Sequence, residues 1–192
     1  KEKLGAGSWT LHRCNALDVD FAKAGFPLHV VGNLPYNVGA LIIKKTLLYG
    51  SSIASATVMV QREVARRIAA KPGTKNNGFL SIFCQFFGET RIAFHVPAGA
   101  FFPRPAVESS VCTIRIDPDL DRKLAPALRG DFFAFVDRGF SQRRKTLAKT
   151  LCTERRKSDI RDILMDMGAG ANARPEELDV TQWLHLYHTV KT

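Results

Sequence analysis

The sequence predicts an α/β domain followed by a small all-helical domain, and two observations support this fold class. Between residues 27 and 70, strand-like and helix-like segments alternate, which is typical of a mainly parallel sheet covered by helices. After residues 117–119 (Asp-Pro-Asp), the apolar residues recur at helical spacing throughout. We therefore expect the α/β domain over residues 1–118 and the helical domain over residues 119–192.

The expected elements of the first domain follow from its apolar periodicity. Residues 79–87 are apolar and aromatic, which favours a core helix, although so short a run also fits a strand. The expected strands are residues 9–14, 27–32, 53–60, 91–96 and 110–116, and the expected helices are residues 40–49, 61–70 and 79–87. In the second domain we expect one amphipathic helix or a close pair over 131–152, and further helices near 158–167 and 180–190.

Composition indicates a globular protein with an anionic partner. Of the 192 residues, 45% are hydrophobic and 24% are charged, so the chain can form a sizeable core. Lysine and arginine exceed the acidic residues by 28 to 18, which gives a net charge of +10 and favours nucleic acid as a partner. The alternative is a generally basic surface without a specific site.

The cysteine and hydropathy patterns argue against a zinc-binding, disulfide-rich or membrane-spanning protein. The four cysteines are scattered, with none of the spacings of a zinc site or a disulfide framework, so we expect no metal. No apolar run approaches the ~20 residues of a membrane span, and no signal-like segment opens the chain. We expect a cytoplasmic monomer without membrane contact.

Residues 30–37 carry the first candidate site, because a buried strand there runs directly into a polar turn. Pro35 fixes its own φ and biases Leu34 toward an extended backbone, so the Asn33 side chain and the Leu34 carbonyl can be presented together. Tyr36 adds an aromatic face. Two acceptors beside a stacking ring suit the exocyclic amine of a flat base, whereas the alternative is an ordinary turn.

Two further features fit a nucleic-acid partner. The loop at 97–105 contains three prolines and two adjacent aromatic residues, which either seal the core or provide a stacking surface. Between residues 138 and 157, eight basic residues face a single acid, which favours binding to backbone phosphates over a solvated helix face. A second basic group lies at residues 62–75.

Four blocks, in this order, resemble the KsgA/RsmA family of ribosomal RNA adenine dimethyltransferases. They are residues 33–36 (Asn-Leu-Pro-Tyr), 60–67 (Val-Gln-Arg-Glu-Val-Ala-Arg-Arg), 100–109 (Ala-Phe-Phe-Pro-Arg-Pro-Ala-Val-Glu-Ser) and 140–147 (Phe-Ser-Gln-Arg-Arg-Lys-Thr-Leu). The likeness extends from about residue 9 to the end and includes residues 174–178 (Arg-Pro-Glu-Glu-Leu). One block alone would be a weak signal, whereas four with compatible spacing are specific.

The resemblance implies a class I, Rossmann-like methyltransferase sheet that uses S-adenosylmethionine, followed by a helical domain that binds RNA. Its implied substrate is a pair of adjacent adenines in the 3′-terminal hairpin of small-subunit rRNA, with the immature small ribosomal subunit as partner. Asn33 and the Leu34 carbonyl, fixed by Pro35, would accept bonds from the adenine amine, and Tyr36 and Phe101 would sandwich the extruded base. Asn15 and Asn33 would contact the cofactor. The implied RNA contacts are Arg62, Arg66, Arg67, Lys71, Arg104, Arg143, Arg144, Lys145 and Lys149.

The chain departs from the family pattern in two respects. The family's glycine loop and acidic residue for the cofactor are absent from this sequence. We therefore expect that Lys1 is not the native start, that the sheet is incomplete at its amino terminus, and that the chain alone is inactive or weak. Asn15 stands where the family usually has aspartate, and Ala106 where it often has lysine, which predicts weaker cofactor and phosphate contacts.

Two alternative functions remain. One is a noncatalytic rRNA-binding factor in ribosome assembly that keeps the base pocket and the basic helices. The other is a related methyltransferase that acts on large-subunit rRNA and confers resistance. The extended Phe-x-Pro-x-Pro loop and the Arg-Arg-Lys block at 143–145 disfavour this second alternative.

Overall fold

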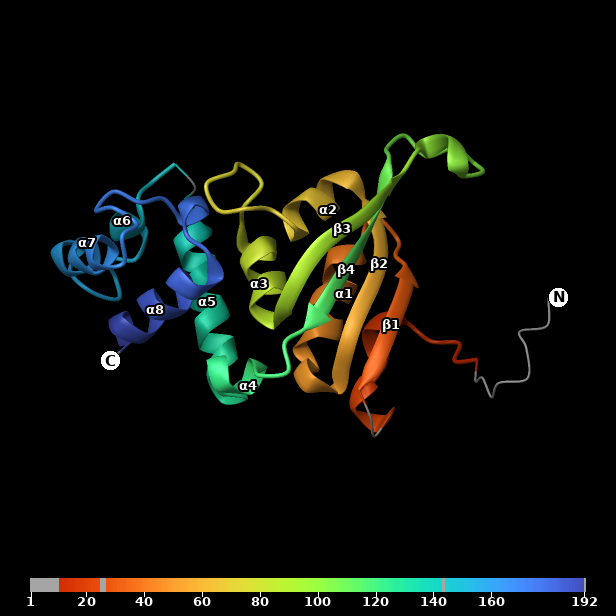
Figure 1. The fold of residues 1–192 in the computed structure, drawn as a ribbon, viewed down its shortest axis with the longest axis horizontal. Coiled ribbons are helices and arrows are strands. Elements are labelled where there is room, and N and C mark those ends of the chain that lie inside the picture. Colours follow the sequence, from red (N-terminus) through yellow and green to blue (C-terminus); the bar gives the residue numbers. More distant parts are fainter. Residues whose placement is uncertain (1–10, 25–26, 143, 192) are drawn as a thin grey trace.

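A computed structural model describes residues 11–24, 27–142 and 144–191 (Figure 1). The described strands are β1 (Leu28–Asn33), β2 (Ile53–Gln61), β3 (Gly88–Val96) and β4 (Ser109–Ile116). The described α-helices are α1 (Gly39–Leu48), α2 (Arg62–Ile68), α3 (Phe79–Phe87), α4 (Leu120–Lys123), α5 (Arg129–Phe140), α6 (Leu147–Thr150), α7 (Lys157–Asp166) and α8 (Val180–Lys191). None of these helices is long and apolar enough to cross a bilayer.

The sheet has the strand order β1-β2-β4-β3. Only β1 and β2 pair in parallel, whereas β4 is antiparallel to both β2 and β3. Strands β1, β2 and β3 therefore run in the same direction and β4 runs against them, so the described sheet is mainly parallel in strand direction, as expected, although only one of its three neighbouring pairs is parallel. A parallel pair needs a crossover connection, which α1 supplies between β1 and β2, whereas β3 and β4 are joined by a loop with no α-helix.

The expected strand at residues 9–14 is wrong as far as it can be followed. Residues 11–14 are exposed and form no strand, and residues 9 and 10 lie outside the described part of the chain. An alternating pattern becomes a strand only where a neighbour completes its hydrogen-bond ladder, and no described strand lies beside these residues. The other expected strands and the three expected helices of the first domain are confirmed to within a few residues.

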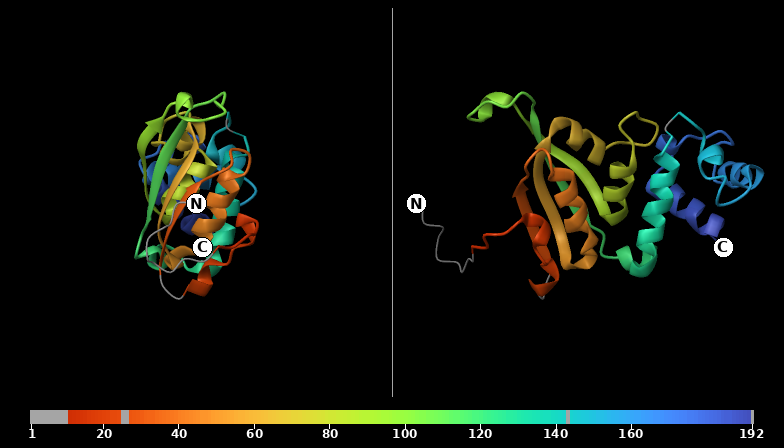
Figure 2. Two further views of the ribbon diagram at one scale, coloured as in Figure 1. Left: turned by 90° about the vertical axis from the view of Figure 1, so that its right-hand side faces the viewer. Right: turned by 180° about the vertical axis from the view of Figure 1, so that it is seen from behind.

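Helices α1, α2 and α3 cover one face of the sheet, as two views of the ribbon show (Figure 1, Figure 2). In β2 the buried residues Ala56, Val58 and Val60 alternate with half-buried ones, as a sheet with one covered face requires. The turn after β1 and the loop between β3 and β4 lie at the same end of the sheet, so the candidate site forms there.

The aromatic core continues across the expected boundary at residues 118/119. Phe83 and Phe86 of α3 meet Phe132 and Phe133 of α5, with ring centroids 4.5 Å apart for Phe83–Phe133 and 5.3 Å for Phe86–Phe132. Such pairs add to the free energy gained from area burial. The helical part is therefore packed firmly onto the sheet domain.

A single continuous helix over 131–152 is wrong, and the alternative of a close pair is confirmed. Helix α5 ends at Phe140 and α6 begins at Leu147. Thr146 has an extended backbone, with φ −71° and ψ 154°, which interrupts helical hydrogen bonding. Leu147 is still buried, so the apolar spacing that suggested one helix reflects burial of both segments against one core. The helices expected near 158–167 and 180–190 are confirmed as α7 and α8.

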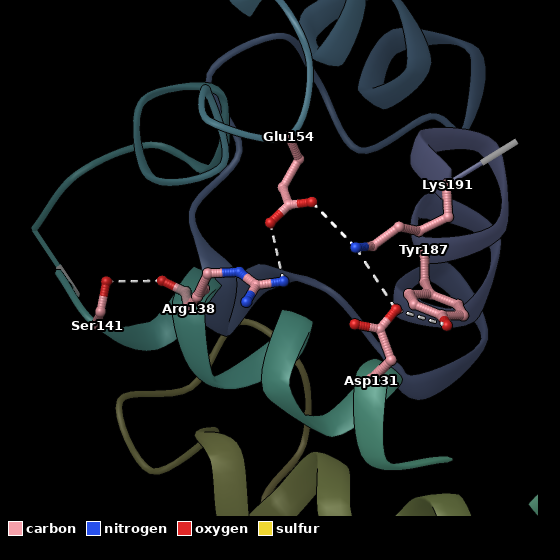
Figure 3. A network of polar contacts seen from close by, with 6 residues as sticks. All are labelled: Asp131, Arg138, Ser141, Glu154, Tyr187 and Lys191. Carbon is pink, nitrogen blue, oxygen red and sulfur yellow. Dashed lines mark hydrogen bonds and ion pairs between the residues drawn. The ribbon is translucent and has the colours of Figure 1, made fainter. Parts of the chain in front are cut away.

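A polar network joins α5, α8 and the segment between α6 and α7 (Figure 3). Lys191 Nζ lies 3.1 Å from Glu154 and 3.5 Å from Asp131, and Arg138 lies 2.9 Å from the other oxygen of Glu154. Tyr187 donates a 3.0 Å hydrogen bond to Asp131. Burial, and then this bond to a carboxylate, raise the pKa of Tyr187 to about 12.

The loop between α2 and α3 is fastened to a segment near the carboxyl end. Asn77 is fully buried, and its side-chain Nδ2 donates to the carbonyls of Glu176 and Leu178 at 2.8 and 3.1 Å. The backbone N–H of Gly73 also donates to the Glu176 carbonyl, at 2.8 Å. Since buried polar groups are costly when unpaired, these bonds fix the loop against the helical domain.

Candidate functional site

The turn after β1 is held rigidly between a strand and a helix. The backbone N–H of Leu34 donates to the carbonyl of Met59 at 3.1 Å, so Leu34 continues the pairing of β1 with β2. The carbonyl of Pro35 accepts from the backbone N–H of Gly39 at 2.8 Å, at the start of α1. Because both sides are fixed, Asn33 and Tyr36 are presented from a defined backbone.

Glycines on either side of the turn make room for the Leu34 side chain. A Cβ at Gly32 would lie 2.9 Å from Leu34 Cδ2, and one at Gly39 would lie 3.4 Å from Leu34 Cβ. Leu34 packs against the core, whereas Asn33 is exposed. In the part of the chain that the structure describes, the Asn33 amide has no hydrogen-bond partner, so it is available to a ligand.

The turn and the aromatic loop form one hollow of about 390 Å³ at the end of the sheet. This volume lies in the range of sites for small molecules or single bases. Its lining residues are Asn33, Leu34, Pro35, Tyr36, Phe101, Phe102, Pro103 and Pro105. The structure thus brings together all four candidate residues of the turn and the predicted stacking residue Phe101.

Tyr36 is anchored by a residue whose importance the sequence did not reveal. Its hydroxyl lies 2.7 Å from Oγ of Ser109, which is fully buried at the start of β4. The backbone of Ser109 pairs with Gln61 of β2 and with Val96 of β3. Ser109 closes one of the family blocks, but a side-chain bond between residues 73 positions apart cannot be read from spacing.

Arg62 forms an ion pair with an acidic residue of the same chain. Its guanidinium donates to the carboxylate of Glu108, and its backbone N–H donates to the Glu108 carbonyl at 2.9 Å. These contacts tie the end of the aromatic loop to the start of α2. Arg62, expected to contact RNA, therefore has a structural partner, whereas Arg104 on the same loop is exposed.

The basic group on α2 lies beside a hollow that also reaches the end of α5. Arg66, Arg67 and Lys71 are exposed on α2 and just after it. Arg67 and Phe140, the last residue of α5, line a polar hollow of about 430 Å³ between the two parts of the chain. The exposed residues Arg144, Lys145 and Lys149 follow Phe140, and Arg143 lies outside the described residues.

Asn15 lies apart from the candidate pocket. Its Oδ1 accepts from the backbone N–H of Leu17 at 3.0 Å, at the start of a short turn of 3₁₀-helix (Ala16–Asp18). Lys45 of α1 donates to the Leu17 carbonyl and so attaches this turn to α1. Asn15 is not among the residues that line the hollow beside Asn33. The two predicted cofactor contacts are therefore not brought into one pocket.

Comparison with known proteins gives consistent matches. The sequence model of a family described as ribosomal RNA adenine dimethylase matches residues 9–191. A ribosomal RNA small subunit methyltransferase A from Chlamydia caviae is 38% identical over 164 residues, which cover 85% of this chain and 58% of that protein. Its namesake from Saccharophagus degradans is 34% identical over 183 residues, which cover 94% of this chain and 66% of that protein. The chain thus spans only part of the length of these relatives.

A solved structure matches the fold. The crystal structure of a dimethyladenosine transferase from Plasmodium falciparum has a TM-score of 0.75 to this chain at 20% sequence identity. The match covers 93% of this chain and 70% of that one. The likeness concerns the arrangement of strands and helices.

Proposed function

Because the chain belongs to the ribosomal RNA adenine dimethylase family, we propose that it serves to methylate N6 of two adjacent adenines in the 3′-terminal hairpin of small-subunit rRNA. The family resemblance of its sequence blocks and the Rossmann-like methyltransferase fold are confirmed. The observation that carries the proposal is the hollow in which Asn33, Leu34, Tyr36 and Phe101 meet.

In the proposed reaction, the target adenine lies in this hollow between the rings of Tyr36 and Phe101. Stacking on aromatic side chains contributes about 1–3 kcal/mol per base, which offsets much of the cost of extrusion. The exposed Asn33 amide and the Leu34 carbonyl would accept the two hydrogens of the amine. Held in this way, the amine nitrogen can turn its lone pair out of the ring and toward the methyl donor.

The basic residues would hold the RNA while the base is extruded. Arg67 lines the polar hollow between the two parts of the chain, as does Phe140, and the exposed residues Arg144 and Lys145 follow Phe140 in the sequence. Contacts with phosphates position the RNA without reading its sequence. We propose that residues 119–192 act as the RNA-binding domain and residues 1–118 as the catalytic part. A cytoplasmic, monomeric state also stays a prediction.

S-adenosylmethionine would supply the methyl group, but the described residues fit it only in part. Asn33 is exposed and unpaired beside the base pocket, whereas Asn15 lies outside that pocket and already accepts a backbone N–H. We therefore expect the 192-residue chain to bind labelled S-adenosylmethionine weakly in equilibrium dialysis. Saturable binding in the micromolar range would contradict this expectation.

The role of Asn33 is tested by replacing it with alanine in the longest coding region that contains these 192 residues. We expect Asn33→Ala to abolish methyl transfer to small-subunit rRNA and to leave RNA affinity nearly unchanged. Asn37→Ala is the matched control, because Asn37 is exposed in the same turn but does not line the hollow. Retained activity in Asn33→Ala would reject the proposed pocket.

A noncatalytic factor for ribosome assembly is the second candidate. It is supported by the position of Asn15, which does not line the hollow that contains Asn33. This candidate predicts that the same long coding region binds the rRNA hairpin but transfers no methyl groups. Methyl transfer by that protein would exclude it.

A further inference from the structure

Two adjacent aromatic residues in the loop between β3 and β4 have different surroundings. Phe101 is half buried, whereas Phe102 is fully exposed, with a relative exposure of 102%. Both rings border the hollow that contains Asn33 and Tyr36. Single exposed apolar residues are common on protein surfaces, so the position of Phe102 at the rim of a base pocket is the informative feature.

The loop that carries Phe102 projects from the body of the protein but is firmly supported. The loop extends beyond the end of the sheet in the front view and in the view from behind (Figure 1, Figure 2). Its start forms a short turn in which the Phe101 N–H donates to the Ala98 carbonyl at 3.3 Å, and its end is tied by Glu108 to Arg62. Three prolines restrict the rest, so little conformational entropy remains to be lost when the ring is covered.

Extrusion of a base leaves a gap in the RNA stack. Unstacking costs a few kcal/mol per step, and apolar side chains that enter such gaps recover part of that cost. A strand that delivers an adenine into the hollow has its vacated stack just outside the rim. The exposed Phe102 ring lies at that rim, and the exposed Arg104 follows two residues later on the same loop.

We propose that Phe102 fills the vacated position in the RNA stack, while Phe101 stacks on the extruded adenine itself. This inference rests on the proposed function and assigns a different binding role to each of the two phenylalanines. It predicts that each ring responds to a different change in the RNA. Phe102 matters only where a stack has been opened, and Phe101 matters only where a target base is present.

The test measures the affinity of the 192-residue chain for three RNAs by fluorescence anisotropy at one salt concentration. The first is the small-subunit hairpin with both target adenines, and the second is the same hairpin with an abasic target position. The third is an unstructured strand of equal length that contains the two adenines. Equal length keeps the number of phosphates, and hence the electrostatic part of binding, constant.

We expect Phe102→Ala to weaken binding about 10-fold on both hairpins and less than about 2-fold on the unstructured strand, as the loss of one stacking contact implies. Phe101→Ala should show the complementary pattern, with weaker binding to the two adenine-containing RNAs and no change on the abasic hairpin. Phe102→Trp should restore binding. Phe94→Ala, which removes an exposed ring on β3 that does not line the hollow, should change nothing.

The outcomes separate this inference from the proposed function. Equal losses for Phe102→Ala on all three RNAs, or no loss on the hairpins, would overturn the assignment of Phe102, while the adenine dependence of Phe101→Ala would still support the pocket. If Phe101→Ala has no effect on any RNA, or if the wild-type chain does not bind the hairpin, the proposed function fails, and the inference fails with it.

Discussion

The hydroxyl of Tyr36 lies 2.7 Å from Oγ of Ser109, and this bond reaches across β2 from the turn after β1 to the start of β4. Ser109 is fully buried and belongs to a strand that is paired on both sides. The Tyr36 hydroxyl is therefore anchored to a buried residue of an interior strand. Ser109 also follows directly after the aromatic loop. The turn with Tyr36 and the loop with Phe101, which line the pocket from two sides, are thus both connected to Ser109.

We expect Ser109→Ala and Tyr36→Phe each to weaken binding of the adenine-containing hairpin by about 3- to 10-fold, since each removes one neutral hydrogen bond. The double variant should be no weaker than either single one, because both remove the same interaction. Anisotropy titrations of the three variants measure this. Ser110→Ala is the matched control. Ser110 is equally buried, but its Oγ lies 2.7 Å from Nδ1 of His95, and neither residue lines the pocket. Additive losses would contradict a shared role.

The basic block after α5 should determine the salt dependence of RNA binding. Replacing Arg143, Arg144 and Lys145 with glutamine is expected to lower affinity and to flatten the plot of log affinity against log salt. Each lost phosphate contact reduces the slope by about 0.7–0.9. The control replaces Arg115, Arg122 and Arg161, which are exposed elsewhere and carry the same total charge. An unchanged slope in the first variant would identify the block as a solvated surface without a phosphate partner.

Gly139 of α5 is required for the packing of Trp183. A Cβ at this position would lie 2.3 Å from Trp183 Cη2, and Trp183 is fully buried. We expect Gly139→Ala to lower the free energy of unfolding by about 1–3 kcal/mol through overpacking. Gly130→Ala in the same helix, where a Cβ meets nothing within 4 Å, should be neutral or stabilising by up to ~1 kcal/mol. Urea denaturation of both variants measures the difference.

Tyr187 should make the protein sensitive to alkaline pH. Its folded-state pKa is raised from 10.0 to about 12, first by burial and then by Asp131, so the unfolded chain releases the phenol proton at lower pH. This contribution to stability is fully present below pH 10 and is lost as the pH rises toward 12. The pKa of Lys191 is also raised, chiefly by its bond to Glu154, and adds a loss of the same sign.

The Tyr187→Phe variant separates these two contributions. We expect it to lose less stability than the wild type between about pH 9 and about pH 12, measured as the shift of the urea midpoint. The remaining loss reflects the network around Lys191. An identical alkaline loss in both proteins would show that Tyr187 does not carry the effect.

Local signals allowed much of the fold to be predicted from the sequence. Burial patterns of period two and of helical period located β1, β2, α1 and α3 to within a few residues, because these elements are buried on defined faces. The parallel or antiparallel direction of β4 could not be predicted in the same way. It depends on which neighbour a strand finds, and β4 inserts between β2 and β3 rather than following the chain order.

In the candidate site, too, local features were predictable from the sequence, whereas tertiary contacts were not. Proline and asparagine after a buried strand indicated the turn at Asn33, and the spacing of the family blocks indicated Phe101. The partners of Arg62 and Tyr36 were not predictable, because Glu108 and Ser109 reach them through tertiary contacts alone. Arg66, Arg67 and Lys71 are exposed, whereas the guanidinium of Arg62 in the same basic group pairs with Glu108 within the protein.

The buried amide of Asn77 has a consequence for protein synthesis. Its acceptor carbonyls belong to residues 99 and 101 positions later, so they leave the ribosome long after Asn77 itself has emerged. During that interval the loop at 71–78 has no such acceptors, and Phe83 and Phe86 lack the rings of α5 that cover them. The loop at 71–78 and α3 therefore reach their full set of contacts only after residue 178 has been translated.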